Sequence, residues 1–331
     1  MPFADIIGHK ASVELLTRAV ARGRVPQSLL FGGPEGVGKR AVAMALAQAV
    51  NCPAQKNGDA CGACNVCRRI AAGRFPDVVV LDKDGEASIK IKPLREKVLD
   101  LVGYRPFEGA RHVFIIEPAD DLTPQAQEAL LKTLEEPPPS AILILITAYP
   151  DMLLGTTRSR CRRVRFGALG HDEVVRVLMA KDKRMDLAEA NGRAAVSGGS
   201  VERAIKFDLK EFSDDRDAAV GLLSAAQRGG VPDRLKAATA FATVEKKRRA
   251  REAAATRLAI LSSLLRDLTV LHAQDANALA NTDLKSELQR LSASFNATRL
   301  LAAFAAVNQA EASIDRNASP KIVADWLAVT M

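Results

Sequence analysis

Aromatic residues are scarce in this 331-residue chain: they make up 4% of the sequence and include a single tryptophan, Trp326. Proteins that hold single-stranded nucleic acid by stacking its bases depend on aromatic side chains. Base stacking is therefore disfavoured as the main activity. The net charge of +8 is a mild basic excess, which fits DNA nearby and ordinary solubility equally well.

The chain also lacks an apolar run of about 18 residues, which a membrane-spanning helix would need. Its first residues, Met-Pro-Phe-Ala-Asp, lack the basic head and apolar core of a signal peptide. We therefore expect a cytoplasmic protein with no membrane partner, in which cysteines are metal ligands more often than disulfides. The length and the 48% apolar content predict two or three domains with buried cores.

A glycine-rich stretch from Gly32 to Arg40 has the form of a phosphate-binding loop. It reads Gly-Gly-Pro-Glu-Gly-Val-Gly-Lys-Arg, and it follows an apolar run and precedes a helix-like segment at 41–50. Gly33, Gly36 and Gly38 would let backbone N–H groups turn inward around a phosphate at a helix N-terminus. Lys39 would then reach the outer phosphates. The order strand, loop, helix is the context that this motif requires.

Two positions argue against ATP hydrolysis by this loop. The residue after Lys39 should carry a hydroxyl that binds magnesium, but it is Arg40, whose guanidinium has only donors and a permanent positive charge. The apolar strand 112–116 ends in Glu117, an acid of the kind that binds magnesium, but Pro118 stands where a second acid often orients water. The alternative is a different ATPase whose catalytic base lies elsewhere.

Four of the five cysteines lie in one short segment, at Cys52, Cys61, Cys64 and Cys67. Four thiolates suffice for a closed tetrahedral zinc site, and gaps of two residues place successive sulfur atoms on one ion. The segment is polar and contains glycine, with no core pattern that would bury four unrelated thiols, which is the alternative. We therefore predict a structural zinc ion.

Apolar strands alternate with helical segments up to residue 166, and the strands show no in-out alternation. This pattern predicts an α/β fold with a parallel sheet covered on both faces. Beyond Gly167 the strands cease, and stripes of leucine predict a helical bundle. The basic run from Lys246 to Arg249 could touch DNA phosphates; a solvated helix face is the alternative.

Together these motifs resemble the clamp-loader subunits of bacterial DNA polymerase III, which belong to the AAA+ ATPases. The resemblance rests on the phosphate loop, the four cysteines, Phe3 to Gly8, Leu130 to Pro138, and Ser159-Arg160-Cys161. It implies three domains: an AAA+ P-loop domain at 1–167 with a zinc module at about 52–67, a small helical lid domain at 168–208, and an all-helical collar for oligomerisation at 209–331.

Two kinds of subunit in that family carry these features, the gamma/tau motor and the delta-prime subunit. The motor has threonine or serine at the position of Arg40 and an acid pair at Glu117-Pro118. It also has an arginine at a helix start where this chain has Glu202, with Arg203 one residue away. These departures resemble delta-prime and imply a hydrolysis-defective subunit. The intact glycines and Lys39 are compatible with binding of ATP or ADP without hydrolysis.

The resemblance further implies a hetero-pentamer with gamma/tau and delta subunits, which loads the sliding clamp onto primed DNA during replication. Arg160 would act as an arginine finger in trans, in the nucleotide site of an adjacent motor subunit. From the residues alone, an ordinary intrachain ion pair is the alternative for Arg160. Thr147, at the end of an apolar strand, matches a polar sensor position.

Two other functions stay open. An active gamma/tau motor would hydrolyse ATP in spite of Arg40 and Pro118. A sequence-independent DNA-binding protein would use the basic excess, and its binding would be tight and sensitive to salt.

Overall fold

The computed structural model of this protein describes residues 1–86, 88–206, 209–228, 230–243, 250–273, 279–281, 284–316 and 318–331. The chain divides into two units. The first comprises Met1–Glu173 and Gly199–Glu202, and the second comprises Val174–Gly198 and Arg203–Met331. The basic run from Lys246 to Arg249, weighed above as a DNA contact, lies outside the described residues.

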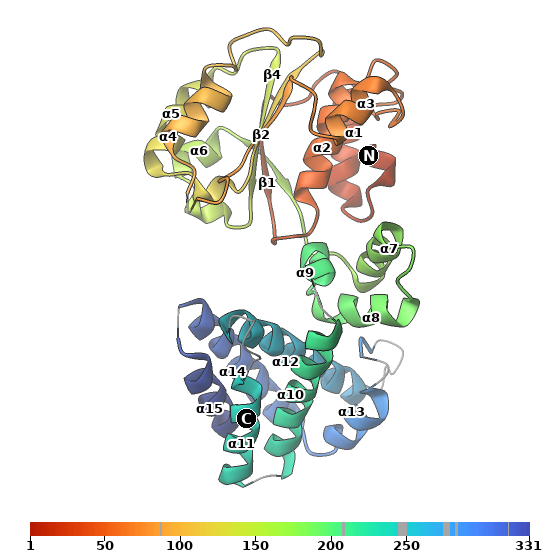
Figure 1. Ribbon diagram of the computed structural model, residues 1–331, viewed down its shortest axis with the longest axis vertical. Coiled ribbons are helices and arrows are strands. Elements are labelled where there is room, and N and C mark those ends of the chain that lie inside the picture. The colour runs from red at the N-terminus through yellow and green to blue at the C-terminus, as the bar shows by residue number, and fades with distance from the viewer. Residues whose placement is uncertain are drawn as a thin grey trace. The chain divides into compact units, whose positions relative to one another are not determined.

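Five parallel strands form the sheet of the first unit, in the order β2-β3-β4-β1-β5. They are β1 (Ser28–Gly32), β2 (Val78–Leu81), β3 (His112–Ile116), β4 (Ala141–Thr147) and β5 (Arg162–Arg165). In Figure 1 the labelled strands β1, β2 and β4 lie between helices α4, α5 and α6 on one side and α1, α2 and α3 on the other. β3 and β4 are buried along their whole length, because helices cover both faces of the sheet. The parallel α/β sheet expected from the sequence is confirmed.

Alternate residues of β1, β2, β3 and β4 belong to two separate apolar cores, one on each face of the sheet. Val113 and Ile115 of β3 pack with residues of α1, α2 and α3. Phe114 and Ile116 pack with residues of α4, η2 and α5 on the other face. The helical segments are η1 (Phe3–Asp5), α1 (Lys10–Ala21), α2 (Lys39–Asn51), α3 (Asn65–Ala71), α4 (Ile91–Leu94), η2 (Arg95–Leu99), η3 (Ala119–Asp121), α5 (Pro124–Glu135), η4 (Pro150–Met152) and α6 (Gly155–Ser159).

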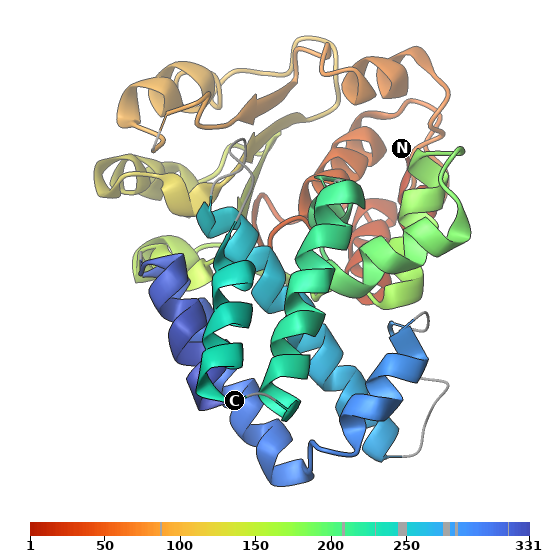
Figure 2. The ribbon, with the colours of Figure 1, turned by 60° about the horizontal axis from the view of Figure 1, so that its bottom comes forward.

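Helices make up the second unit, as the leucine stripes predict. The remaining helices of the chain are α7 (His171–Lys181), α8 (Leu187–Val196), α9 (Val201–Lys206), α10 (Leu209–Arg228), α11 (Val231–Ala242), α12 (Ala250–His272), α13 (Lys285–Ser292), α14 (Ala297–Asp315) and α15 (Pro320–Thr330). α11 packs against α15, and α12 packs against α10 and α14 (Figure 2). One apolar core, which includes Leu261, Leu265 and Phe295, holds them together.

The boundary expected at residue 208 stays a prediction. Val196 of α8 belongs to the same apolar core as the leucines of α12, so residues 174–198 lie in one unit with the C-terminal helices. Within the described ranges, no helix combines the length and the hydropathy that a bilayer span requires.

A buried carboxylate, Asp77, fixes the loop that leads from η2 to β3. Its oxygens accept hydrogen bonds from the backbone N–H groups of Phe107 at 2.6 Å, Glu108 at 2.9 Å and Gly109 at 2.7 Å. Burial by itself raises the pKa of Asp77, but the three donors favour the charged form, and the pKa lies below its usual value. The charged carboxylate therefore stabilises the loop.

We expect Asp77→Ala to lower the free energy of unfolding by about 2–4 kcal/mol, because three backbone N–H groups lose their acceptor. Chemical denaturation at pH 7 measures the change. The exposed Asp100 provides the control, and Asp100→Ala should stay within about 0.5 kcal/mol of wild type.

The pH dependence tests the charge itself. The folded pKa of Asp77 is depressed, so its stabilisation is present above the unfolded pKa of about 3.9 and is lost as pH falls through the folded pKa. The difference between wild type and Asp77→Ala should therefore narrow in acid. A difference that persists unchanged from pH 7 to pH 3 would contradict this account.

Candidate functional site

The glycine-rich loop lies between β1 and α2, as the motif requires. Gly33, Gly36 and Gly38 have φ angles of 155°, 72° and 104°, which L side chains rarely adopt. The loop ends where α2 begins, at Lys39. Its backbone therefore has the positive φ angles that a glycine-rich phosphate loop before a helix N-terminus requires.

Two other segments of the first unit close on this loop. A Cβ atom at Gly33 would lie 2.1 Å from the carbonyl oxygen of Phe166, and one at Gly36 would lie 2.2 Å from Oγ of Ser200. The backbone N–H of Glu202 also donates to the carbonyl of Gly36 at 3.2 Å. The segment 199–202 therefore contacts the loop directly, although more than 150 residues separate the two in sequence.

The side chain of Lys39 folds back into the loop. Its Nζ donates to the carbonyl oxygens of Gly33 and Pro34, both at 2.6 Å. Burial lowers the pKa of Lys39 from its usual value. Four nearby carboxylates oppose that shift: Glu117, Glu35, Asp120 and Glu202. Lys39 is thus a buried cation at the centre of a cluster of acids.

Arg40 pairs with the acid that follows β3. Its Nη1 lies 3.5 Å from Oε2 of Glu117. Burial raises the pKa of Glu117, and the positive charges of Arg40 and Lys39 oppose that shift. A magnesium ion at Glu117 would have to compete with this guanidinium, which cannot itself bind a cation.

Thr147 lies at the end of β4, beside the loop. Its carbonyl oxygen accepts a hydrogen bond from the N–H of Gly33 at 3.3 Å. Its buried hydroxyl accepts one from the N–H of Tyr149 at 2.9 Å. The polar end of β4 and the loop after β1 therefore meet at one edge of the sheet.

Arg160 follows α6 and forms an ion pair within the chain. Its Nε and Nη2 lie 2.8 Å and 2.5 Å from Oε1 of Glu135, the last residue of α5. Its Nη1 donates to the carbonyl of Thr156 at 2.9 Å. The intrachain ion pair that the residues alone suggested for Arg160 is therefore present. None of these contacts involves the phosphate loop.

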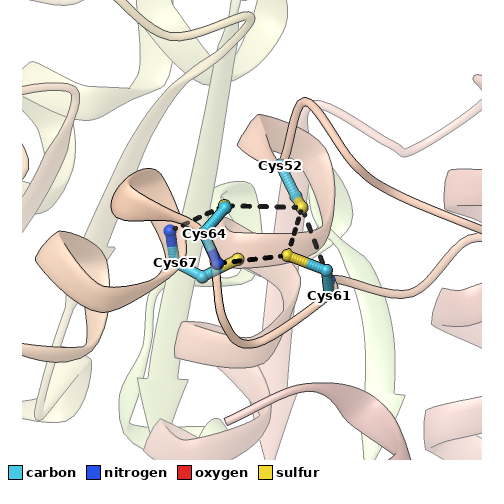
Figure 3. A group of neighbouring side chains, drawn as sticks. All are labelled: Cys52, Cys61, Cys64 and Cys67. Atoms are coloured by element: carbon cyan, nitrogen blue, oxygen red, sulfur yellow. Dashed lines mark hydrogen bonds between the residues drawn. The ribbon is translucent and has the colours of Figure 1, made fainter.

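The four clustered cysteines converge on one point (Figure 3). Their sulfur atoms all lie within 4.8 Å of one another. Cys52 follows α2, Cys64 caps the N-terminus of α3, and Cys67 lies in its first turn. The sulfur of Cys52 is 3.6 Å from that of Cys61 and 3.9 Å from that of Cys64. These four thiols can hold one metal ion.

Backbone N–H groups also point at these sulfur atoms. The N–H groups of Cys61, Cys64 and Cys67 lie 3.4, 3.3 and 3.4 Å from the sulfur atoms of Cys52, Cys61 and Cys64. Such bonds to Cys61 lower its pKa to about 6, while burial raises the pKa of Cys52 and Cys67. Cys161 lies apart from the cluster, and burial raises its pKa to about 12.

The cysteine segment is attached to the N-terminal segment. Both carboxylate oxygens of Asp59 accept backbone hydrogen bonds, from Phe3 at 2.7 Å and Ala4 at 2.9 Å. Gly58 packs so closely on α1 that a Cβ atom there would lie 2.1 Å from the carbonyl of Thr17. A metal held by the cysteines would therefore also fix the start of the chain.

Two family models match this sequence. One, described as DNA polymerase III, delta subunit, matches residues 8–170, and another, described as DNA polymerase III, delta subunit, C terminal, matches residues 233–322. The chain belongs to the DNA polymerase III clamp-loader family. The segment 8–170 contains the sheet, the phosphate loop, the cysteines and Arg160. The first unit of this clamp-loader subunit thus combines a parallel five-stranded sheet with a glycine-rich loop between β1 and α2.

Curated relatives come from both kinds of subunit that the sequence resembles. The tau subunit of Escherichia coli DNA polymerase III is 36% identical over 172 residues, which are 52% of this chain and 26% of the relative. The delta' subunit of Pseudomonas aeruginosa is 41% identical over 144 residues, which are 42% of this chain and 43% of the relative. The chain therefore spans from about a quarter to under half of the length of these relatives.

A solved structure is also similar. The DNA polymerase III gamma subunit-related protein of Thermotoga maritima is 19% identical, with 96% of this chain and 97% of that chain covered and a TM-score of 0.44.

The structure of this clamp-loader subunit brings together most of the predicted nucleotide-site residues. Gly33, Gly36, Lys39, Arg40, Glu117 and Thr147 all belong to one linked set of contacts. Two further residues of this set did not stand out in the sequence. Asp120, one of whose carboxylate oxygens is buried without a hydrogen-bond partner among the described residues, lies near Lys39. His9 Nε2 lies 2.8 Å from the carbonyl of Val37 in the loop.

Substitution of Gly36 tests the contact between the loop and the segment 199–202. Alanine there would be strained by the φ of 72° and would also clash with Ser200 and with the Cβ of Glu202, 2.7 Å away. Gly73→Ala is the control. Gly73 has a φ of 66°, but a Cβ atom there would meet nothing within 4 Å, so this variant has the backbone strain without the clash. Both variants should lose about 1–2 kcal/mol to strain, and Gly36→Ala should lose about 1–3 kcal/mol more. Equal stabilities in chemical denaturation would contradict the close contact.

Proposed function

We propose that this chain is a delta-prime type of clamp-loader subunit, which does not hydrolyse ATP itself. The ion pair between Arg40 and Glu117 is the observation that carries the proposal. Magnesium bridging the phosphates is central to phosphoryl transfer, and here the acid that would bind it faces a fixed positive charge. Pro118, the next residue, offers no carboxylate to orient an attacking water.

The loop itself is suited to bind nucleotide phosphates. Its glycines have the required backbone angles, and Lys39 lies within the loop. Glu202, whose charge raises the pKa of both Lys39 and Glu117, would repel a terminal phosphate. We therefore infer binding of ATP or ADP without turnover.

Arg160 supplies the catalytic contribution in this proposal. As an arginine finger it would enter the nucleotide site of an adjacent gamma/tau subunit and stabilise charge on the transferring phosphoryl group. Arginine fingers contribute about 10³ to 10⁵ in rate. The position of Arg160 after α6, with its side chain 32% exposed, supports this role.

The proposed setting is a cytoplasmic hetero-pentamer with gamma/tau and delta subunits. That complex would load the sliding clamp onto primed DNA for DNA polymerase III. The names of the relatives, tau, gamma and delta', support the choice of partners.

The second candidate is an active gamma/tau motor subunit. The 36% identity with the tau subunit of Escherichia coli and the complete set of loop glycines favour it. ATP turnover by the purified chain discriminates between the two functions.

We also propose that the four cysteines bind a structural zinc ion. With Zn–S bonds of about 2.3 Å, a tetrahedral site has sulfur atoms about 3.8 Å apart. The observed separations of 3.6 Å and 3.9 Å fit that geometry. Four thiolates leave no open position on the ion, so its role would be to hold the segment 52–67 and the N-terminal segment together.

In an ATPase assay the chain alone should show no turnover. Added to gamma/tau, delta, the sliding clamp and primed DNA, it should stimulate hydrolysis. Its Arg160→Ala variant should not stimulate hydrolysis. The rate of ATP hydrolysis in the neighbouring nucleotide site that Arg160 enters should fall roughly a thousandfold. Arg158→Ala is the matched control, because Arg158 is equally exposed and is paired with Asp151. Turnover by the chain alone would instead identify a motor subunit.

Metal analysis tests the zinc proposal. Protein purified without chelator should contain about one zinc ion per chain, and Cys64→Ser should lose it because a ligand is removed. Cys161→Ser should keep the metal, since Cys161 lies apart from the cluster. A zinc content of the wild-type protein far below one ion per chain would contradict the proposal.

A further inference from the structure

Glu135 holds the guanidinium of Arg160 from one side. Oε1 of Glu135 accepts from Nε at 2.8 Å and lies 2.5 Å from Nη2. On Nη1, the carbonyl of Thr156 accepts at 2.9 Å, and Oγ of Ser159 is a weaker acceptor at 3.5 Å. The contacts come from two helices, α5 and α6, and they restrict a side chain that would otherwise have many rotamers.

These contacts do not use the whole guanidinium. Arginine has five N–H donors in a rigid planar fork. Glu135 accepts from the edge formed by Nε and one hydrogen of Nη2, and Thr156 accepts one hydrogen of Nη1. These contacts leave at least one N–H donor of the guanidinium unused, the second hydrogen of Nη2. A side chain that is 32% exposed can therefore still donate to an acceptor outside the chain.

The two helices that hold Arg160 are themselves fixed to each other. The hydroxyl of Thr123 caps the N-terminus of α5 by accepting a hydrogen bond from the N–H of Ala126. Leu130 and Leu134 are buried on one face of the helix. Oε1 of Gln127, on α5, accepts a hydrogen bond at 2.8 Å from the N–H of Leu154, the residue that caps α6. Glu135 and the backbone around Arg160 are thus parts of one rigid assembly.

We propose that Glu135 is a positioning residue for the arginine finger, which orients Arg160 for the nucleotide site of the neighbouring subunit. This inference rests on the proposed function. Preorganisation lowers the cost of ordering a flexible side chain when the transition state forms. The pair is half exposed, with Glu135 at 48%, so it contributes little to folding stability. Orientation of the finger is therefore its main effect.

The experiment measures steady-state ATP hydrolysis by the complex of this chain with gamma/tau, delta, sliding clamp and primed DNA. The Arg160-dependent rate is the rate with wild type minus the rate with Arg160→Ala. Glu135→Ala should reduce that rate about tenfold through kcat, with KM for ATP unchanged, because the finger acts in the transition state. Glu135→Gln should recover most of it, since its amide oxygen still accepts from Nε. The control is the neighbouring Glu136, which is exposed and takes part in none of the ion pairs formed among the described residues. Glu136→Ala should give the same Arg160-dependent rate as wild type.

Two further measurements separate positioning from a structural role. Glu135→Ala should change the melting temperature by less than about 2 °C and should assemble as wild type does. In the Arg160→Ala background, Glu135→Ala should have no additional effect. An additional effect there, or a full Arg160-dependent rate in Glu135→Ala, would overturn the inference. If Arg160→Ala itself leaves the rate unchanged, the proposed arginine finger fails, and the positioning role fails with it.

Discussion

Burial of the parallel sheet on both faces is the constraint on which the first unit depends. The central strands β3 and β4 have no exposed face, so polar groups can stand only where strands end. In a parallel sheet these carboxyl ends meet at one edge. Gly33 after β1 and Thr147 at the end of β4 are joined there by a hydrogen bond, and Glu117 follows β3 at the same edge. Polar residues more than 100 positions apart thus form one site, because the buried parts of the strands are filled by apolar side chains.

The charges at this edge are the physical basis for the proposal that this phosphate loop binds nucleotide without hydrolysing it. Lys39 is a buried cation among four acids, and Arg40 adds a second positive charge beside Glu117. A metal ion would be the natural partner of such acids in an ATPase, but here fixed cations of the protein take that place. The segment containing Glu202 lies against Gly36 and adds negative charge where the outer phosphates would lie. In the proposed function the loop keeps nucleotide binding, and Arg160 makes the catalytic contribution in a neighbouring subunit.

The cysteine segment follows a different physical rule. It has few apolar side chains larger than alanine with which to build a core, and its order depends on convergence of sulfur atoms and on a few hydrogen bonds. Asp59 joins it to the backbone of Phe3 and Ala4. Gln48 of α2 also contributes, because its amide nitrogen donates to the carbonyl of Cys67 at 2.6 Å. The segment is therefore connected to the N-terminal segment and to the helix that starts at the phosphate loop.

The sequence by itself determined the features that are written in local patterns. Continuous apolar runs predicted the buried strands, glycines at fixed spacing predicted the turns of the loop, and the spacing of four cysteines predicted their convergence. Arg40 and Pro118 could be judged from their chemistry alone. Only the tertiary structure decided which distant residues meet: Glu135 with Arg160, Asp77 with the loop at 107–109, and the segment 199–202 with Gly36. Such contacts depend on the order of the strands and on the path of the chain between them. Local periodicity reports which face of an element is buried, but it carries no information on which other element covers that face.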